Sequence, residues 1–555
     1  MLARFALLLS LVLTVAARTG ASETPRLAVV IAIDQFRGDY LKRYGPYFGE
    51  GGFKRLLAGG TNFEHSYHRH AVTITAPGHA SILTGTFASS HGITSNEWLD
   101  RSTWEMVNSV EDRSAALVGI NPAEMGPVAA ANPAKTGRSP RNLQAETLGD
   151  QLKAKYGDKS KVFAVSNKDR SAILLGGKKA DAAYWDEFGR MVTSTYYRTE
   201  LPAWVRAFND EKRVHGTFGK TWDRLREVAI YDALQGPDDD PAEGAPAGLG
   251  RTFPRKITGG KDTITPAFFS AFDNTPFAAE FIGQFTERAI REEKLGRHEG
   301  IDLLCVSFSS IDSAGHSFGP DSHEVMDAVL RMDRVIASLL DCLDREVGLA
   351  NCVIAMSADH GVSPLPERVL ARKLAGDAGR VKVAELDAAA KTALDAKFGA
   401  LPKGQTWFTR DNYGYHLRRE ALEAKKVSAA EAAKVMKAAL APLPYMAVVV
   451  TRDEVLAVPE DGDSLPVLMR RSYRAASDRD VVFAFNPYYM SKTGTGSTHG
   501  APYEYDRHVP QLYFGAGVPK GVTRTEQVGV DNLAPTLAKL LGVKAPAQAK
   551  SRSLL

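Results

Sequence analysis

The chain has 555 residues, of which 44% are hydrophobic and 24% are charged, a composition that is ordinary for a folded globular protein. Its length allows two or three average domains, or one large α/β domain with insertions. The formal charge is only +4 and no long basic run is present, which argues against nucleic acid as a partner.

The first residues have the pattern of a secretory signal peptide. Arg4 precedes an apolar run from Phe5 to Ala17, which is too short for a stable membrane anchor, and small residues follow it. We therefore expect residues 1–21 to be removed, leaving an exported protein, periplasmic or extracellular, without a stable membrane anchor. An uncleaved N-terminal anchor is the alternative.

Three apolar runs have the character of buried parallel strands, and each run ends in an aspartate. The runs are residues 26–34, 301–312 and 351–359, ending at Asp34, Asp312 and Asp359. Near-continuous apolar runs suit strands that helices cover on both faces, so they predict an α/β fold with a doubly wound, mostly parallel sheet. Apolar residues at helical spacing predict one helix within residues 323–346 and a short one within 531–543.

The rest of the chain is interpreted as elaboration of one catalytic domain over residues 22–555. We expect insertions or caps at about 180–290 and 365–490. The Pro/Gly-rich acidic segment 236–250 is expected to be a solvated loop, with additional Ca²⁺ binding as the alternative.

Cysteine usage is sparse. Cys305 and Cys352 lie in the apolar runs, and Cys342 lies in the helical segment between them. We expect buried thiols, although an exported protein could form one disulfide.

Metal-ligating side chains accompany the three strand ends. In a doubly wound sheet these ends converge, and three carboxylates at one place repel one another unless cations neutralise them. Histidines occur beside two of the aspartates, and one more lies in the sequence STHG. This ligand mix suits zinc, and six protein ligands are too many for one tetrahedral ion but fit two. The candidate ligands are Asp34, Asp312, His316, Asp359, His360 and His499.

A two-metal site gives a role to Thr75, in the sequence TAPGH. Two metal ions can clamp the attacking and leaving oxygens of a phosphoryl transfer. A hydroxyl oxygen bound to one of them would ionise more easily and attack as an alkoxide. The Pro-Gly corner after Thr75 would present that hydroxyl at the edge of the sheet.

In this order, these residues follow the pattern of the alkaline phosphatase superfamily. The chain resembles the exported, monomeric alkaline phosphatases of the PhoK and PafA types, which are also similar to nucleotide pyrophosphatase/phosphodiesterases. The likeness runs from RLAVVIAIDQFRGDYL to VDNLAPTLAKLLG. The resemblance implies a monomer that hydrolyses small-molecule phosphate monoesters at two Zn²⁺ ions through a phospho-threonine intermediate.

The resemblance also assigns the residues. It implies that one zinc is held by Asp312, His316 and His499. It implies that the other is held by Asp34, Asp359, His360 and the Thr75 oxygen. Asn96, Lys168 and Arg170 would contact the phosphoryl oxygens.

Rival functions use the same motifs differently. A monoester is a dianion that suits two side-chain cations, so Lys168 and Arg170 favour monoesters. A phosphodiesterase or nucleotide pyrophosphatase on the same metal core is the alternative, and it would need a pocket for a second ester group. A sulfatase is disfavoured because TAPGH stands where sulfatases carry C/S-x-P-x-R. A non-catalytic zinc- or phosphate-binding protein is a further alternative.

The other histidines near Thr75 are not assigned as ligands. We expect His65, His68 and His70 to lie behind the metal ligands or at the surface. His79 and His91 are expected to be structural.

Overall fold

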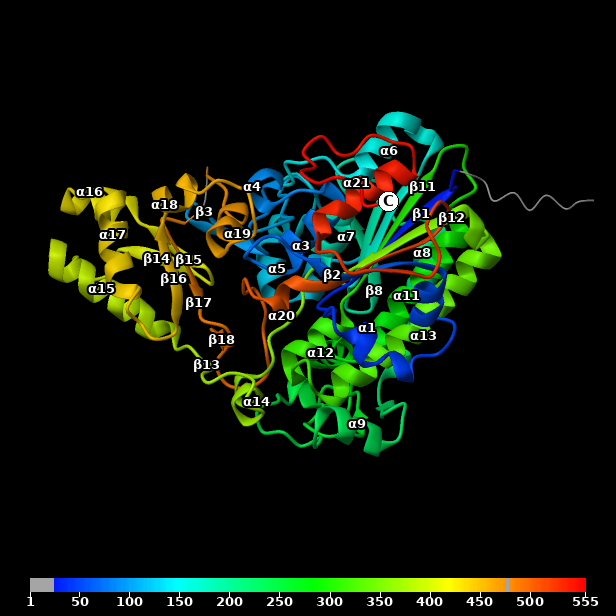
Figure 1. The fold of residues 1–555 in the computed structure, drawn as a ribbon, viewed down its shortest axis with the longest axis horizontal. Helices are drawn as coiled ribbons and strands as arrows, with labels where there is room; N and C mark the ends of the chain where they lie inside the picture. Colours follow the sequence, from blue (N-terminus) through cyan, green and yellow to red (C-terminus); the bar gives the residue numbers. More distant parts are fainter. Residues whose placement is uncertain (1–23, 476–478) are drawn as a thin grey trace, which may run out of the picture.

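One large mixed sheet forms the centre of the molecule (Figure 1). The computed structural model describes residues 24–475 and 479–555, so the expected signal peptide lies outside the described residues. The eleven strands have the order β20-β2-β19-β12-β1-β11-β6-β7-β8-β5, with β21 also pairing with β2. In chain order they are β1 (Leu27–Ile33), β2 (Gly60–Tyr67), β5 (Leu117–Val118), β6 (Val162–Ser166), β7 (Ala182–Glu187), β8 (Arg190–Ser194), β11 (Asp302–Phe308), β12 (Cys352–Ser357), β19 (His508–Gly515), β20 (Val522–Arg524) and β21 (Val528–Gly529).

The middle of this sheet is parallel. Strands β12, β1, β11, β6 and β7 each pair in parallel with the next, whereas β19 and β8 join them antiparallel on the two sides. Every residue of β1 is fully buried, as expected of a strand covered on both faces. The predicted mostly parallel α/β fold is confirmed.

Two groups of helices pack on the sheet. One group contains α3 (Thr75–Thr84), α6 (Leu148–Tyr156), α7 (Asp169–Gly176) and α21 (Leu533–Leu540), and the other contains α11 (Phe277–Glu292), α12 (Ser310–Phe318) and α13 (His323–Glu346). The side chain of Ser322 accepts a hydrogen bond from the Val325 backbone N–H and so fixes the start of α13. The helices predicted within 323–346 and 531–543 are both present.

A second, smaller sheet lies in the expected insertion at 365–490. Its antiparallel order is β14-β15-β17-β16, and helices cover it around a separate hydrophobic core that includes Trp407, Tyr415 and Met436. Its elements are α15 (Val383–Phe398), β14 (Phe408–Asp411), β15 (Gly414–Leu417), α16 (Arg419–Lys425), α17 (Ala429–Leu440), β16 (Met446–Thr451) and β17 (Val481–Phe485). In Figure 1 this unit, which we call the lobe, stands to one side of the central sheet.

The other expected insertion, at 180–290, is partly integrated into the sheet. Its first residues form β7 and β8, and its last helix, α11, packs against β6 and β11. Between them lie α8 (Ala203–Asp210), β9 (Thr221–Trp222), α9 (Val228–Gln235), β10 (Arg255–Lys256) and α10 (Pro266–Asp273).

The acidic segment 236–250 is held by arginines, which corrects the expectation of a simply solvated loop. Asp238, Asp239 and Asp240 each lie within 2.8 Å of a different guanidinium. The partners are Arg224, Arg251 and Arg368. Opposite charges close in space explain why three consecutive carboxylates are tolerated there.

The three cysteines are free and buried, which confirms the expectation of buried thiols. Among the described residues, none of the helices has both the length and the apolar character needed to cross a bilayer.

Candidate metal centre and active-site pocket

The three predicted aspartates meet at the carboxyl edge of the parallel strands. Asp34 directly follows β1, and Asp359 lies two residues after β12. Asp312 differs from the expectation of a strand end: β11 stops at Phe308, and Asp312 lies in the first turn of α12. All three aspartates are buried, with no more than 4% of any of these residues exposed.

Two histidines approach Asp312. His316 lies one helical turn further along α12, and its Nε2 is 3.3 Å from Asp312 Oδ1. His499 comes from the C-terminal part of the chain, with its Nε2 3.5 Å from the same oxygen and 3.2 Å from His316 Nε2. Ligand atoms of these three residues all lie within 4.8 Å of one another, so one metal ion could bind them together.

A second group of possible ligands adjoins the first. Atoms of Asp34, Asp312 and His360 also lie within 4.8 Å of one another. The Nε2 atom of His360 is 3.4 Å from Asp34 Oδ1 and 3.3 Å from Asp359 Oδ2. Asp312 therefore lies within reach of both candidate metal positions, and Asp359 adjoins the second.

The orientation of the imidazole rings fits metal binding. In each of the three rings, Nδ1 lies within 3.0 Å of a backbone carbonyl oxygen, at Ser497 for His316, Gly361 for His360 and Thr73 for His499. A carbonyl only accepts, so Nδ1 carries the proton and the lone pair of Nε2 faces the carboxylates. Lone pairs opposed to carboxylate oxygens repel unless a cation lies between them. Consistent with this, the buried atoms Asp34 Oδ1 and His360 Nε2 have no hydrogen-bond partner in the part of the chain that the structure describes.

The negative charge at this site exceeds what the side-chain cation beside it can balance. Burial and the carboxylates of Asp312 and Asp359 raise the pKa of Asp34 above its ordinary value. Lys168 Nζ donates a hydrogen bond to Asp34 Oδ2 at 2.7 Å and another to Asp312 Oδ2. Burial opposes the charge of Lys168, but these two carboxylates raise its pKa above the ordinary value. Further positive charge, as divalent ions supply, would stabilise the cluster.

Thr75 is the first residue of α3, and its sequence neighbours explain its position. A Cβ atom on Gly78 would lie 2.1 Å from the backbone oxygen of Asp359. Only glycine at this position therefore allows the start of α3 to approach the end of β12 so closely. The expected corner in TAPGH is instead the first turn of α3, because Pro is tolerated there and Gly78 allows this turn to pack directly on the strand end at Asp359. Thr75 itself is 1% exposed.

His79 was expected to be structural, and its contacts tie it to the site. Its Nδ1 is 2.8 Å from the backbone oxygen of Thr75 and 3.1 Å from Asp359 Oδ2, and its Nε2 is 2.8 Å from Ser307 Oγ. The ring thus fixes the start of α3 relative to a candidate metal ligand.

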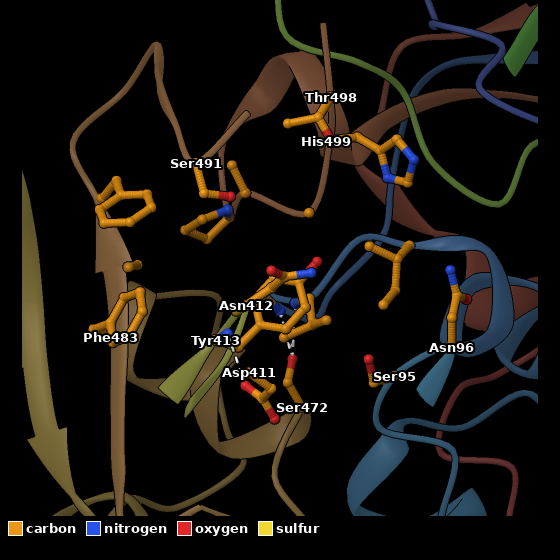
Figure 2. Close-up of a pocket in the computed structure, with 18 of the residues that line it drawn as sticks. Ser95, Asn96, Asp411, Asn412, Tyr413, Ser472, Phe483, Ser491, Thr498 and His499 are labelled. Carbon is orange, nitrogen blue, oxygen red and sulfur yellow. Dashed lines mark hydrogen bonds between the residues drawn. The ribbon is translucent and has the colours of Figure 1, made fainter. Parts of the chain in front are cut away.

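A pocket of about 720 Å³ opens beside the candidate ligands (Figure 2). Asn96, Arg170, His316 and His499 line one part of it, and residues of the lobe such as Tyr413 and Phe483 line another. Further residues outside the lobe, such as Ile74 and Tyr505, complete the lining. Asn96 Oδ1 accepts a hydrogen bond of 2.8 Å from the Ala76 backbone N–H, which joins it to the start of α3. The Nη1 atom of Arg170 lies 3.7 Å from Asp169 Oδ1, whereas its buried Nε has no hydrogen-bond partner among the described residues and could donate to an anionic ligand.

The histidines upstream of Thr75 lie away from the ligand atoms. His65 is exposed, whereas His68 and His70 are buried. His68 Nε2 is 2.8 Å from the backbone oxygen of Ala358, directly before Asp359. His91 is also buried, with its Nε2 3.2 Å from Ser81 Oγ inside α3.

Two further residues at the site escaped the sequence reasoning. Gln35, in a left-handed conformation at φ 66°, donates from Nε2 to Asp312 Oδ1 at 2.6 Å. Its position directly after Asp34 in the sequence could have indicated that Gln35 lies near the carboxylates. Lys492 Nζ donates to the backbone oxygen of His316 at 2.7 Å, and nothing in the sequence around Lys492 distinguishes it.

Comparison with known proteins gives consistent matches over most of the chain. The family model for type I phosphodiesterase / nucleotide pyrophosphatase matches residues 28–447. A protein of Myroides odoratus named calcium-transporting ATPase is 33% identical over 94% of this chain and 93% of its own length. Alkaline phosphatase PafA of Elizabethkingia meningoseptica is 31% identical over 97% of this chain and 95% of its own. The crystal structure of wild-type PafA superposes with a TM-score of 0.87 at 30% identity, covering 96% of this chain and 98% of that one.

Proposed function

Because this chain belongs to the type I phosphodiesterase / nucleotide pyrophosphatase family, we propose that it is a metal-dependent alkaline phosphatase acting on small-molecule phosphate monoesters. The observation that carries the proposal is the buried group of three carboxylates with three histidine Nε2 atoms facing them, close to the start of α3 where Thr75 lies. We further propose that the protein is exported after removal of residues 1–21 and acts as a monomer.

The donor set supports two zinc ions. Asp312, His316 and His499 would hold one, and Asp34, Asp359, His360 and Thr75 would hold the other, with Asp312 near both. When bound, the ions would lower the pKa of a hydroxyl or water oxygen and offset charge on the leaving oxygen.

In the proposed reaction, Thr75 Oγ attacks phosphorus opposite the ester oxygen. The Thr75 hydroxyl gives up its proton to water as a bond forms between Oγ and phosphorus, the phosphorus–ester oxygen bond breaks, and the leaving alkoxide takes a proton from water to become the alcohol. Water then attacks the phospho-threonine, the Oγ–phosphorus bond breaks, Oγ takes a proton from water to restore the hydroxyl, and inorganic phosphate leaves. The buried position of Thr75 at the start of α3 keeps the hydroxyl fixed for this attack.

The polar groups around the pocket favour a dianionic phosphoryl group. Arg170 would bind two phosphoryl oxygens with its planar guanidinium, and Asn96 would donate a neutral hydrogen bond. Lys168 does not line this pocket but hydrogen-bonds both Asp34 and Asp312, and it would add a third donor from the side of those carboxylates. A diester has one charged oxygen fewer and gains less from these groups.

Phosphodiester hydrolysis is the second candidate, because the matched family is named for it and the pocket is roomy. Comparing kcat/KM for an aryl phosphate and the matching diester, on zinc-loaded protein at alkaline pH, separates the two. We expect a monoester preference of several orders of magnitude.

The variant Arg170→Ala makes the test specific. Losing charge-assisted hydrogen bonds of about 1.5–3 kcal/mol should lower kcat/KM for the monoester roughly 10- to 100-fold and for the diester much less. Arg213→Ala, at an exposed arginine, is the control. A diester preference, or equal losses on both substrates, would contradict the assignment to monoesters.

A further inference from the structure

We propose that the lobe supplies a subsite for the leaving group of the ester, and that this subsite selects planar aromatic leaving groups. The inference rests on the proposed function and adds a substrate class to it.

The direction in which the leaving group exits follows from the geometry of in-line displacement. The leaving oxygen lies opposite the attacking oxygen. It is therefore closer to the candidate metal position whose proposed ligands do not include Thr75. That position is formed by Asp312, His316 and His499, and both histidines line the pocket. A leaving group bound there would extend into the pocket toward the lobe.

The pocket is too large to serve the phosphoryl group alone. Its volume of about 720 Å³ lies within the range of sites that bury drug-sized ligands. Aromatic rings of the lobe line it, among them Phe483 and Phe485 of β17, whose centroids are 5.3 Å apart at 40°. Rings at such spacings offer faces and edges on which another aromatic ring packs well.

Tyr413 brings an aromatic ring of the lobe to the metal centre. It lies in the turn between β14 and β15, and Figure 2 shows it between Phe483 and His499. A Cβ on Gly500, the residue after His499, would lie 2.2 Å from Tyr413 Oη, so the tyrosine fills the space that a side chain there would occupy.

The ring of Tyr413 is fixed rather than free to turn. The Arg479 guanidinium lies 5.5 Å from its centroid, and Asp411 accepts hydrogen bonds of 2.8 Å from Arg479 Nε. A cation–π contact held by a buried ion pair restrains the ring before any ligand binds. Tyr413 is thus the specificity-determining residue that we assign to this subsite.

Binding of non-hydrolysable phosphonates tests the subsite apart from catalysis. Dissociation constants of phenyl-, cyclohexyl- and methylphosphonate are measured by calorimetry on the zinc-loaded full chain. We expect phenylphosphonate to bind about tenfold more tightly than methylphosphonate, and more tightly than the saturated ring of similar size. Equal affinities for phenyl- and cyclohexylphosphonate would overturn the preference for aromatic groups.

Substitutions at Tyr413 test whether this residue causes the preference for aromatic groups. Tyr413→Ala should reduce the ratio of phenyl- to methylphosphonate affinity about fivefold to tenfold, and Tyr413→Phe, which keeps the ring, should preserve most of it. Phe408→Ala is the matched control, because Phe408 lies on β14 and contacts Tyr415 in the core of the lobe but does not line the pocket. A ratio that Tyr413→Ala leaves unchanged, or that Phe408→Ala reduces as much, would overturn the assignment.

Hydrolysis of methyl phosphate is measured in parallel. If the wild-type protein hydrolyses it but binds all three phosphonates equally, the subsite is refuted and the phosphatase assignment stands. If it releases phosphate from neither methyl nor phenyl phosphate, the proposed function fails and the subsite inference fails with it.

Discussion

Several histidines near Thr75 in the sequence are buried, and burial determines whether their imidazole rings are charged. His91 is completely buried; its Nδ1 accepts a hydrogen bond from the Ile93 backbone N–H, and its Nε2 faces Ser81 Oγ. Burial lowers the pKa of His91 to about 3 and that of His68 to about 4. Both rings are therefore neutral in the folded protein at pH 7.

This difference in pKa predicts loss of stability in acid. Between pH 6.5 and about 3 the unfolded chain protonates His91 and the folded chain does not, so the free energy of unfolding falls as the pH falls. One such group contributes a slope of up to about 1.4 kcal/mol per pH unit. The variant His91→Gln should show a shallower fall between pH 7 and pH 5 in urea denaturation.

The same substitution at exposed His65 is the control for removing a histidine. If the free energy of unfolding falls equally in the wild type and in His91→Gln over this pH range, protonation of His91 in the unfolded chain does not cause the loss of stability.

Contact between α3 and the end of β12 fixes Thr75, the proposed nucleophile, relative to Asp359, a proposed metal ligand. Gly78 permits the contact, and His79 bridges it through the Thr75 backbone oxygen and Asp359 Oδ2. Because the approach involves backbone atoms on both sides, side-chain rearrangement cannot relieve an added atom at position 78.

Gly78→Ala is therefore expected to separate these two elements. Overpacking of this kind costs about 1–3 kcal/mol, and the shift should weaken zinc binding because Asp359 moves with the strand end. Urea denaturation of the metal-free protein and zinc titration with a fluorescent competitor measure the two effects.

Gly45→Ala is the matched control, since a Cβ at Gly45 has nothing within 4 Å. If Gly78→Ala keeps wild-type zinc affinity and stability, the packing of α3 on β12 does not position the site.

The proposed metal centre joins parts of the molecule that are distant in the sequence. Asp34, Asp312 and Asp359 follow three neighbouring strands, and His499 comes from the chain after the lobe. Ions bound by all of these segments bind the folded chain and not the unfolded one, so they should stabilise the whole sheet.

Zinc is accordingly expected to raise the Tm of the protein after chelator treatment. At a free zinc concentration 100 times Kd, the stabilisation from one site is about 2.7 kcal/mol. Differential scanning fluorimetry across a zinc series measures the shift. Asp312→Asn should remove most of it, because Asp312 lies within reach of both candidate positions.

Asp341→Asn, at an exposed aspartate, controls for the loss of one charge. An equal shift of Tm in Asp312→Asn and in the wild type would show that zinc stabilises the protein elsewhere.

Three central strands of the main sheet and several candidate site residues could be predicted from local sequence. Two local patterns were informative: the apolar runs before Asp34 and Asp359, and the helical spacing of apolar residues within 323–346. Burial of a strand on both faces produces the first pattern, and burial of a helix on one face produces the second. The residue types Asp and His at strand ends likewise indicated metal chemistry without any knowledge of distance, because few other functions suit that combination.

Tertiary structure alone decided the contacts between distant segments. It placed Asp312 near both candidate metal positions, Lys168 between two carboxylates, and Tyr413 of the lobe against Gly500. No local pattern encodes these arrangements, because each depends on how the sheet order and the docking of the lobe bring together residues up to hundreds of positions apart. Periodicity reports which side of an element is buried, whereas the partner that buries it is set by the packing of the whole chain.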